Sequence, residues 1–217
     1  MKNIVLLFLI GFLTIKSYSQ KKEIYLNDDL ESISESEFKE KKEPFSYNIK
    51  YDLDTIIVNV KALRIKKGLI SKQKLDSIKN NISKVSGKTI KESDMIVINY
   101  YPGLDNCNSS YSNPFLREKY SQYLKEIKKN ENVSQFFIYK TIEGTEKYGK
   151  KLEWFPDNGN VIKNIFFPLH YNCDSFAIID KNGNFFLTRG EYDILIIIDL
   201  INNPEKTFDL NYYQYSH

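Results

Sequence analysis

The sequence has 217 residues, of which 41% are hydrophobic and 14% are aromatic, enough for the core of one domain or one and a half. Its formal charge at neutral pH is only +3, and Lys and Glu are mixed in short runs such as residues 39–43. Binding to backbone phosphates needs a one-sided basic surface, so this charge pattern argues against nucleic acid as a partner.

The first nineteen residues have the three parts of a secretory signal peptide: a positive charge at Lys2, an apolar run over residues 4–13 and a short end at residues 17–19. We expect cleavage after Ser19, which lowers the formal charge from +3 to +1 and places the mature chain in the periplasm or outside the cell. The alternative is an uncleaved membrane anchor. The apolar run has about half the length needed to span a bilayer, and we expect no transmembrane segment in the mature chain.

Residues 20–90 are predicted to form a small α+β extension at the amino end. Strands are expected at residues 23–26 and 55–60, the second rich in β-branched side chains. A short helix is expected after Ser34, because Glu37 stands at capping-box spacing from it. A longer helix is expected from Ser71 to Gly87, with one apolar stripe made by Leu75, Ile78, Ile82 and Val85.

Residues 91–205 are predicted to form an α/β domain, followed by a tail at 206–217. Residues 95–101 are apolar with almost no alternation, which is typical of a strand buried on both faces. The expected order after this strand is a polar loop, a helix from Pro114, a strand at 133–139, a short helix at 161–167 and two strands at 175–180 and 184–187. The pair Asn182-Gly183 predicts a hairpin between those strands. Residues 191–201 fit a strand or a buried helix, and we favour the helix.

The order of elements from Met95 onward resembles the thioredoxin-like fold, and in particular the exported thiol-disulfide proteins of the TlpA type. The resemblance is carried by residues 95–101, which lead into a loop with Cys107, and by residues 176–183 with their Asn-Gly turn. It covers a little over half of the chain. It implies a three-layer α/β/α domain, whereas alternating strands and helices alone occur in many α/β domains.

The sequence departs from this family at two places. The family has Cys-x-x-Cys at its reactive loop, but residues 107–110 read Cys-Asn-Ser-Ser, so the second thiol of the motif is missing. The family also has a cis-proline before the third core strand, and the corresponding residues are Asp174 and Ser175.

Cys107 and Cys173 are the only cysteines, and in an oxidising compartment two thiols most simply form one disulfide. The thioredoxin-like arrangement places the loop after the first core strand beside the loop before the hairpin, at the carboxyl ends of strands where open α/β sheets have their crevice. This implies a disulfide between the two cysteines. The alternatives are two silent thiols or a redox-active Cys107 as the catalytic candidate. The crevice would be lined by Tyr101, Asp105, Ser110, His170 and Asp174.

His170, Cys173 and Cys107 could together offer three ligands to zinc or copper, but the sequence shows no fourth, and we predict neither a metal nor another cofactor. The function predicted from these observations is a non-catalytic binding module for a protein or peptide in the bacterial envelope. The first alternative is a thiol-disulfide oxidoreductase acting through Cys107 with Cys173 as a distant partner. The second is a structural or immunity-type envelope protein.

Overall fold

The computed structural model describes residues 21–40, 45–109 and 114–211. The expected signal peptide lies outside the described residues, as does Ser110. The chain divides into two compact units, Met1–Ala62 and Leu63–His217. Within the described ranges, no helix has both the length and the apolar character needed to cross a bilayer.

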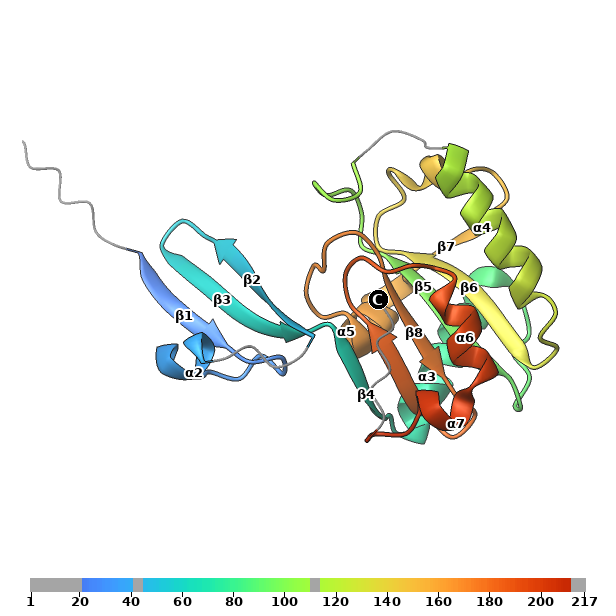
Figure 1. Cartoon of the computed structure of the whole chain (residues 1–217), viewed down its shortest axis with the longest axis horizontal. Helices are drawn as coiled ribbons and strands as arrows, with labels where there is room; N and C mark the ends of the chain where they lie inside the picture. Colours follow the sequence, from blue (N-terminus) through green and yellow to red (C-terminus); the bar gives the residue numbers. More distant parts are fainter. Residues whose placement is uncertain (1–20, 41–44, 110–113, 212–217) are drawn as a thin grey trace, which may run out of the picture. The chain divides into compact units, whose positions relative to one another are not determined.

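The first unit is a small sheet with one short helix (Figure 1). Its strands are β1 (Lys22–Leu26), β2 (Ser46–Asp52) and β3 (Ile56–Leu63), in the order β1-β3-β2 with β1 parallel to β3. Helix α2 (Glu35–Lys39) begins at Ser34, whose side chain accepts a hydrogen bond from the Glu37 N–H while the Glu37 carboxylate accepts one from the Ser34 N–H. This is the capping box that the spacing predicted.

The second unit contains a six-stranded sheet in the order β4-β9-β8-β5-β6-β7. Strands β5, β6 and β7 are parallel to one another, whereas β8 is antiparallel to β5 and β9, and β4 is antiparallel to β9. The sheet is therefore mixed. Its strands are β4 (Ile65–Leu69), β5 (Met95–Tyr101), β6 (Val133–Tyr139), β7 (Trp154–Pro156), β8 (Ser175–Ile179) and β9 (Asn184–Thr188).

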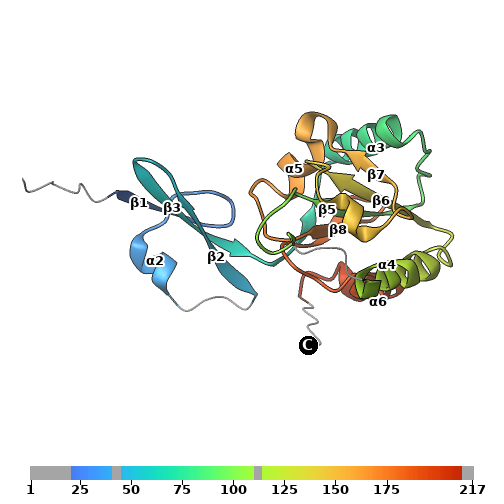
Figure 2. The ribbon, with the colours of Figure 1, turned by 90° about the horizontal axis from the view of Figure 1, so that it is seen from above.

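Helices cover both faces of this sheet (Figure 2): α3 and α5 lie on one face, and α4 and α6 lie on the other. The central strand β5 is consequently buried from Ile96 to Tyr101, as its continuous apolar sequence predicted. The helices are α3 (Lys72–Ser86), α4 (Pro114–Ile127), α5 (Val161–Phe166), α6 (Ile196–Asn202) and α7 (Pro204–Thr207), with short 3-10 turns η1 (Thr145–Tyr148) and η2 (Asn158–Asn160).

The structure differs from the sequence prediction in where the chain divides and in where the last predicted helix begins. The division of the chain falls at Ala62, not at residue 90, because β4 pairs with β9 and α3 buries its apolar stripe in the second unit. The last predicted helix begins at Ile196, five residues later than expected, because Asp193 starts a turn by accepting the N–H of Leu195 at 2.9 Å.

Candidate functional site

Three loops meet at one end of the strands of the six-stranded sheet. The register pairs Tyr100 near the end of β5 with Ser175 at the start of β8, and it pairs Phe176 of β8 with Thr188 at the end of β9. Antiparallel pairing therefore brings the loop after β5, the loop before β8 and the loop after β9 to the same end of the strands. This is where the sequence predicted the crevice to lie.

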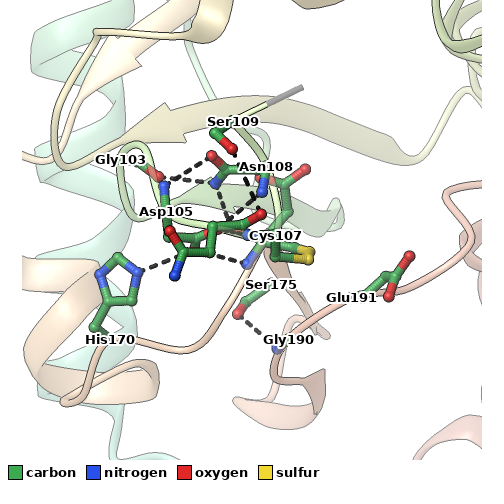
Figure 3. The surroundings of a disulfide bond; sticks show 12 residues. Gly103, Asp105, Cys107, Asn108, Ser109, His170, Ser175, Gly190 and Glu191 are labelled. Carbon is green, nitrogen blue, oxygen red and sulfur yellow. Dashed lines mark hydrogen bonds and ion pairs between the residues drawn. A yellow bond between two sulfur atoms is a disulfide. The ribbon is translucent and has the colours of Figure 1, made fainter. Parts of the chain in front are cut away.

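The structure places Cys107 and Cys173 at disulfide distance, with their Cα atoms 5.2 Å apart across a sequence separation of 66 residues (Figure 3). Cys107 is exposed, whereas Cys173 is 8% exposed. Cys173 has a φ of +68°, in the left-handed region that residues other than glycine seldom occupy. Because Cys107 is the exposed residue of the pair, an incoming thiol would meet its sulfur first.

Asp105 holds the backbone on both sides of the disulfide. Its Oδ1 atom accepts the N–H groups of Cys107 and Asn108, each at 2.9 Å. Its Oδ2 atom accepts the N–H of Cys173 at 2.8 Å and lies 3.0 Å from Nε2 of His170. One carboxylate thus receives donors from the loop after β5 and from the loop before β8 (Figure 3).

Asn108 makes a second link between the same two loops. Its side chain is 5% exposed, and its Nδ2 atom donates to the carbonyl groups of Gly103 at 2.8 Å and Cys173 at 3.2 Å. Its Oδ1 atom accepts the Asp105 N–H at 3.0 Å. Since these bonds do not involve sulfur, the two loops stay connected whether or not the disulfide is intact.

The disulfide forms part of the wall of a pocket of about 300 Å³. Its other walls come from α4, from η1 and from the loop after β9. The pocket is lined by Cys107, Asn108, Phe115, Leu116, Lys119, Tyr120, Lys147, Tyr148, Cys173, Asp174, Glu191, Tyr192 and Ile194.

Asp174 is the carboxylic acid of this pocket with the most perturbed acidity. Its Oδ2 atom accepts a hydrogen bond from the Tyr148 hydroxyl at 2.6 Å, while its Oδ1 atom is buried without a hydrogen-bond partner among the described residues. Burial raises the pKa of Asp174 to about 6, and the Tyr148 hydrogen bond and the positive charge of Lys147 oppose this rise only in part. The group can therefore take up or release a proton near neutral pH.

Lys147 reaches the site from η1. It is 8% exposed, its Nζ atom donates to the Asn108 carbonyl, and the same atom lies 5.0 Å from the ring centre of Tyr148 and 5.9 Å from that of Tyr101. Burial lowers the pKa of Lys147, because the charged form loses hydration that these partners replace only in part.

The residues proposed from the sequence for the crevice have different positions. Asp105 binds the backbone of both cysteines, His170 contacts Asp105, and Asp174 lines the pocket together with the disulfide. Tyr101 is fully buried, and its hydroxyl donates to the Glu143 carbonyl at 3.0 Å, so it supports the pocket from behind.

Sequence reasoning did not find Lys147, Tyr148 or Glu191. Lys147 and Tyr148 belong to a stretch between β6 and β7 that has no apolar period, and Glu191 follows β9 as one charge among many. Asn108 had a weak signal, since it directly follows Cys107 and Asn side chains commonly bind nearby backbone groups in loops.

A metal site is not formed here by the residues that the sequence suggested. The Nε2 atom of His170 faces Asp105, and the group near the sulfur atoms is instead the Glu191 carboxylate, with the three ligand atoms within 4.8 Å of one another. While the two sulfur atoms are bonded to each other, this group offers only a carboxylate.

No protein-family model matches this sequence, and no curated protein is similar to it at a significant level. Solved structures to which this structure is similar include the following three. A reduced 2-Cys peroxiredoxin of Plasmodium vivax is 20% identical, with 54% of this chain and 82% of that chain covered and a TM-score of 0.37. A secreted Mycobacterium tuberculosis disulfide oxidoreductase, homologous to E. coli DsbE, is 11% identical, with coverages of 52% and 83% and a TM-score of 0.36. M. tuberculosis DsbF is 13% identical, with coverages of 51% and 80% and a TM-score of 0.34.

The fold class follows from the strand order itself. When β4, α3, β7 and α7 are set aside, the second unit runs β5, α4, β6, α5, β8, β9 and α6 along the chain. These strands lie in the order β9-β8-β5-β6, with helices on both faces. By its strand order, the protein is thus an α/β protein whose mixed central sheet has the thioredoxin-like arrangement that the sequence resemblance implied, with an additional small sheet at the amino end.

Proposed function

We propose that the second unit carries out thiol-disulfide exchange through Cys107 and Cys173. The observation that carries this proposal is the pairing of an exposed sulfur with a buried one at the wall of a pocket that also contains Asp174. A structural disulfide needs neither an exposed cysteine on one side nor a titratable acid in the pocket that it lines.

The exchange begins when a substrate thiolate attacks Sγ of Cys107. A bond forms between the substrate sulfur and Cys107, the Cys107–Cys173 bond breaks, and Cys173 leaves as a thiolate. The protonated form of Asp174, the neighbour of Cys173, is the candidate donor of the proton that this thiolate takes up. A second thiol of the substrate then attacks the substrate sulfur of the mixed disulfide and releases Cys107. The substrate dithiol loses two electrons and the cysteine pair gains them.

The partner of Cys107 differs from the one in the Cys-x-x-Cys motif, because it comes from another loop. Asp105 and Asn108 bind the backbone of both loops, so the sulfur atoms stay neighbours after reduction. We infer that the cysteine pair can open and close without rearrangement of the loops.

Trapping of a mixed disulfide tests this function. Cys173→Ser leaves Cys107 as a single exposed thiol, so this variant should form a stable mixed disulfide with an oxidised peptide, whereas Cys107→Ser, with only the buried thiol, should form much less. The wild type should reduce insulin disulfides in the presence of dithiothreitol. Equal trapping by both variants, or no trapping and no insulin reduction, would contradict the proposal.

A second candidate is the non-catalytic binding module that the sequence favoured. Phe115 is 68% exposed and lines the pocket with Leu116 and Ile194, which would suit an apolar side chain of a bound peptide. The double variant Cys107→Ser, Cys173→Ser separates the two functions: it should lose exchange in either case, and it should keep full peptide binding only if binding is the function.

We also propose that the protein is exported after cleavage behind Ser19 and acts in the bacterial envelope. A cysteine pair that closes a disulfide fits an oxidising compartment. The mass of the protein recovered from the envelope fraction would show this, since the cleaved chain begins at Gln20; an intact amino terminus would contradict it.

A further inference from the structure

Glu191 is presented to the disulfide by an anchored loop. The loop follows β9, and it is held by hydrogen bonds at Gly190, at Glu191 itself and at the Tyr192 side chain. The anchoring hydrogen bonds run from the Gly190 N–H to Oγ of Ser175 at 3.2 Å, from Nη1 of Arg64 to the Glu191 carbonyl at 2.9 Å, and from the Tyr192 hydroxyl to Oδ1 of Asn99 at 2.6 Å. The Glu191 side chain therefore starts from a fixed position beside the sulfur atoms (Figure 3).

The Glu191 carboxylate lies at the mouth of the site. The residue is exposed, and a carboxylate oxygen is within 4.8 Å of both sulfur atoms. None of the described residues forms a hydrogen bond or an ion pair with this carboxylate, so its negative charge is turned toward whatever approaches Cys107.

Among the described residues, the positive side chains near the pocket bind groups other than the Glu191 carboxylate. Nζ of Lys119 forms an ion pair of 2.8 Å with Asp193, and the buried Lys147 lies beside Asp174. Arg64 donates to the backbone of Glu191. An incoming group near the Cys107 sulfur therefore meets a carboxylate that no described side chain pairs with.

We propose that Glu191 is a specificity-determining residue, which makes the disulfide react preferentially with thiols that carry positive charge, in particular protein cysteines flanked by Lys or Arg. The proposal rests on the exchange activity proposed above. A carboxylate beside the reacting sulfur repels a thiolate, and a cationic group next to that thiolate both removes the repulsion and pairs with Glu191. An anionic flank adds to the repulsion.

The size of the effect follows from Coulomb's law. One unit charge held about 7 Å from another in water changes a rate about threefold, so opposite charges on two substrates should differ by about tenfold in total. Because Glu191 is exposed, salt should reduce this preference.

The test measures the rate at which small thiols reduce the Cys107–Cys173 disulfide in the full chain. Cysteamine, 2-mercaptoethanol and 2-mercaptoethanesulfonate supply a cationic, a neutral and an anionic thiol, and each rate is expressed per thiolate and corrected for thiol basicity. We expect cysteamine to be about tenfold faster than the sulfonate. In Glu191→Gln cysteamine should be only about one- to threefold faster than the sulfonate, and in Glu191→Lys the sulfonate should be the faster of the two.

Glu118→Gln is the matched control, because Glu118 is an exposed carboxylate on α4 that lies outside this pocket. It should keep the wild-type ratio. Equal rates for the charged thiols in the wild type, or an unchanged ratio in Glu191→Gln, would overturn the role of Glu191 and leave the exchange proposal standing. A disulfide that none of the three thiols reduces would instead overturn the exchange proposal itself.

Discussion

Asp105 and Asp174, two carboxylates of the site, receive different numbers of hydrogen-bond donors. Asp105 has three backbone N–H groups and His170 as partners, so both of its oxygens are satisfied. Asp174 accepts a hydrogen bond from Tyr148 at Oδ2, and its Oδ1 atom is buried and unsatisfied among the described residues. A buried carboxylate with few donors favours its protonated form. The difference supports the roles proposed above, in which Asp105 anchors the loops and Asp174 supplies the proton.

The raised pKa of Asp174 has a consequence for stability. The pKa is about 6 in the folded protein against 3.8 for the free side chain, so the folded state holds this proton more tightly than the unfolded state does. The resulting stabilisation is fully present below about pH 4 and is lost as pH rises through about 6. The groups that act on Asp174 are Tyr148 and Lys147 of η1, Tyr120 of α4 and Asp105 of the loop after β5.

Asp174→Asn should therefore stabilise the protein at high pH. The amide cannot ionise, so the variant does not lose the stabilisation that the wild type loses as pH rises. The free energy of unfolding of the variant minus that of the wild type should therefore increase by up to about 3 kcal/mol from pH 4 to pH 8. Urea denaturation of both proteins at the two pH values measures this difference. Asp76→Asn, which removes an exposed carboxylate from α3, should show no comparable change. A difference for Asp174→Asn that is equal at pH 4 and pH 8 would contradict the assigned pKa.

At the scale of elements, the hairpin between β8 and β9 also positions β4. Gly183 has a φ of +91°, and a Cβ atom there would lie 2.7 Å from the carbonyl oxygen of Ile70, the residue that follows β4. The Ile70 N–H in turn donates to the Gly183 carbonyl at 2.9 Å. Glycine thus allows both the turn and the close approach of the two backbones.

Replacement of this glycine should separate the two effects. Gly183→Ala should lower the free energy of unfolding by about 3 kcal/mol, from strain at positive φ and from the clash with Ile70. Gly159→Ala is the matched control: its φ is +71° but its Cβ would have open space, with the nearest atom at 4.0 Å, so about 1 kcal/mol is expected. Equal losses in urea denaturation would show that the approach to Ile70 carries no cost.

The sequence predicted elements well where one signal dominated. The apolar run of β5 and the Asn-Gly turn were found at the predicted residues, because burial on both faces and a left-handed turn each leave a strong local pattern. Strands β4 and β7 were not predicted, since a strand of five residues with two lysines and one of three residues have no readable period. The meeting of the two cysteines followed from topology, but Lys147 and Glu191 reach the site through irregular segments that no pattern encodes.

At the scale of the whole molecule, the site is built from the second unit alone. The disulfide, the carboxylates that hold or face it and every strand of the six-stranded sheet lie between Leu63 and His217. The first unit contributes a three-stranded sheet of its own. The physical requirements for exchange, a sheet edge, two fixed loops and a pocket, are therefore met without residues 1–62.

A chain that begins at Leu63 should consequently fold and keep the chemistry of the site. We expect it to unfold in one cooperative transition, because β4 to β9 and α3 to α7 share one core. Its disulfide should be reduced by dithiothreitol within about twofold of the rate for the full chain, since exchange depends on local access to the sulfur. Far-UV circular dichroism during urea denaturation and the reduction rate provide the two measurements. A fragment that is unfolded in the absence of urea would show instead that the first unit completes the core of the second.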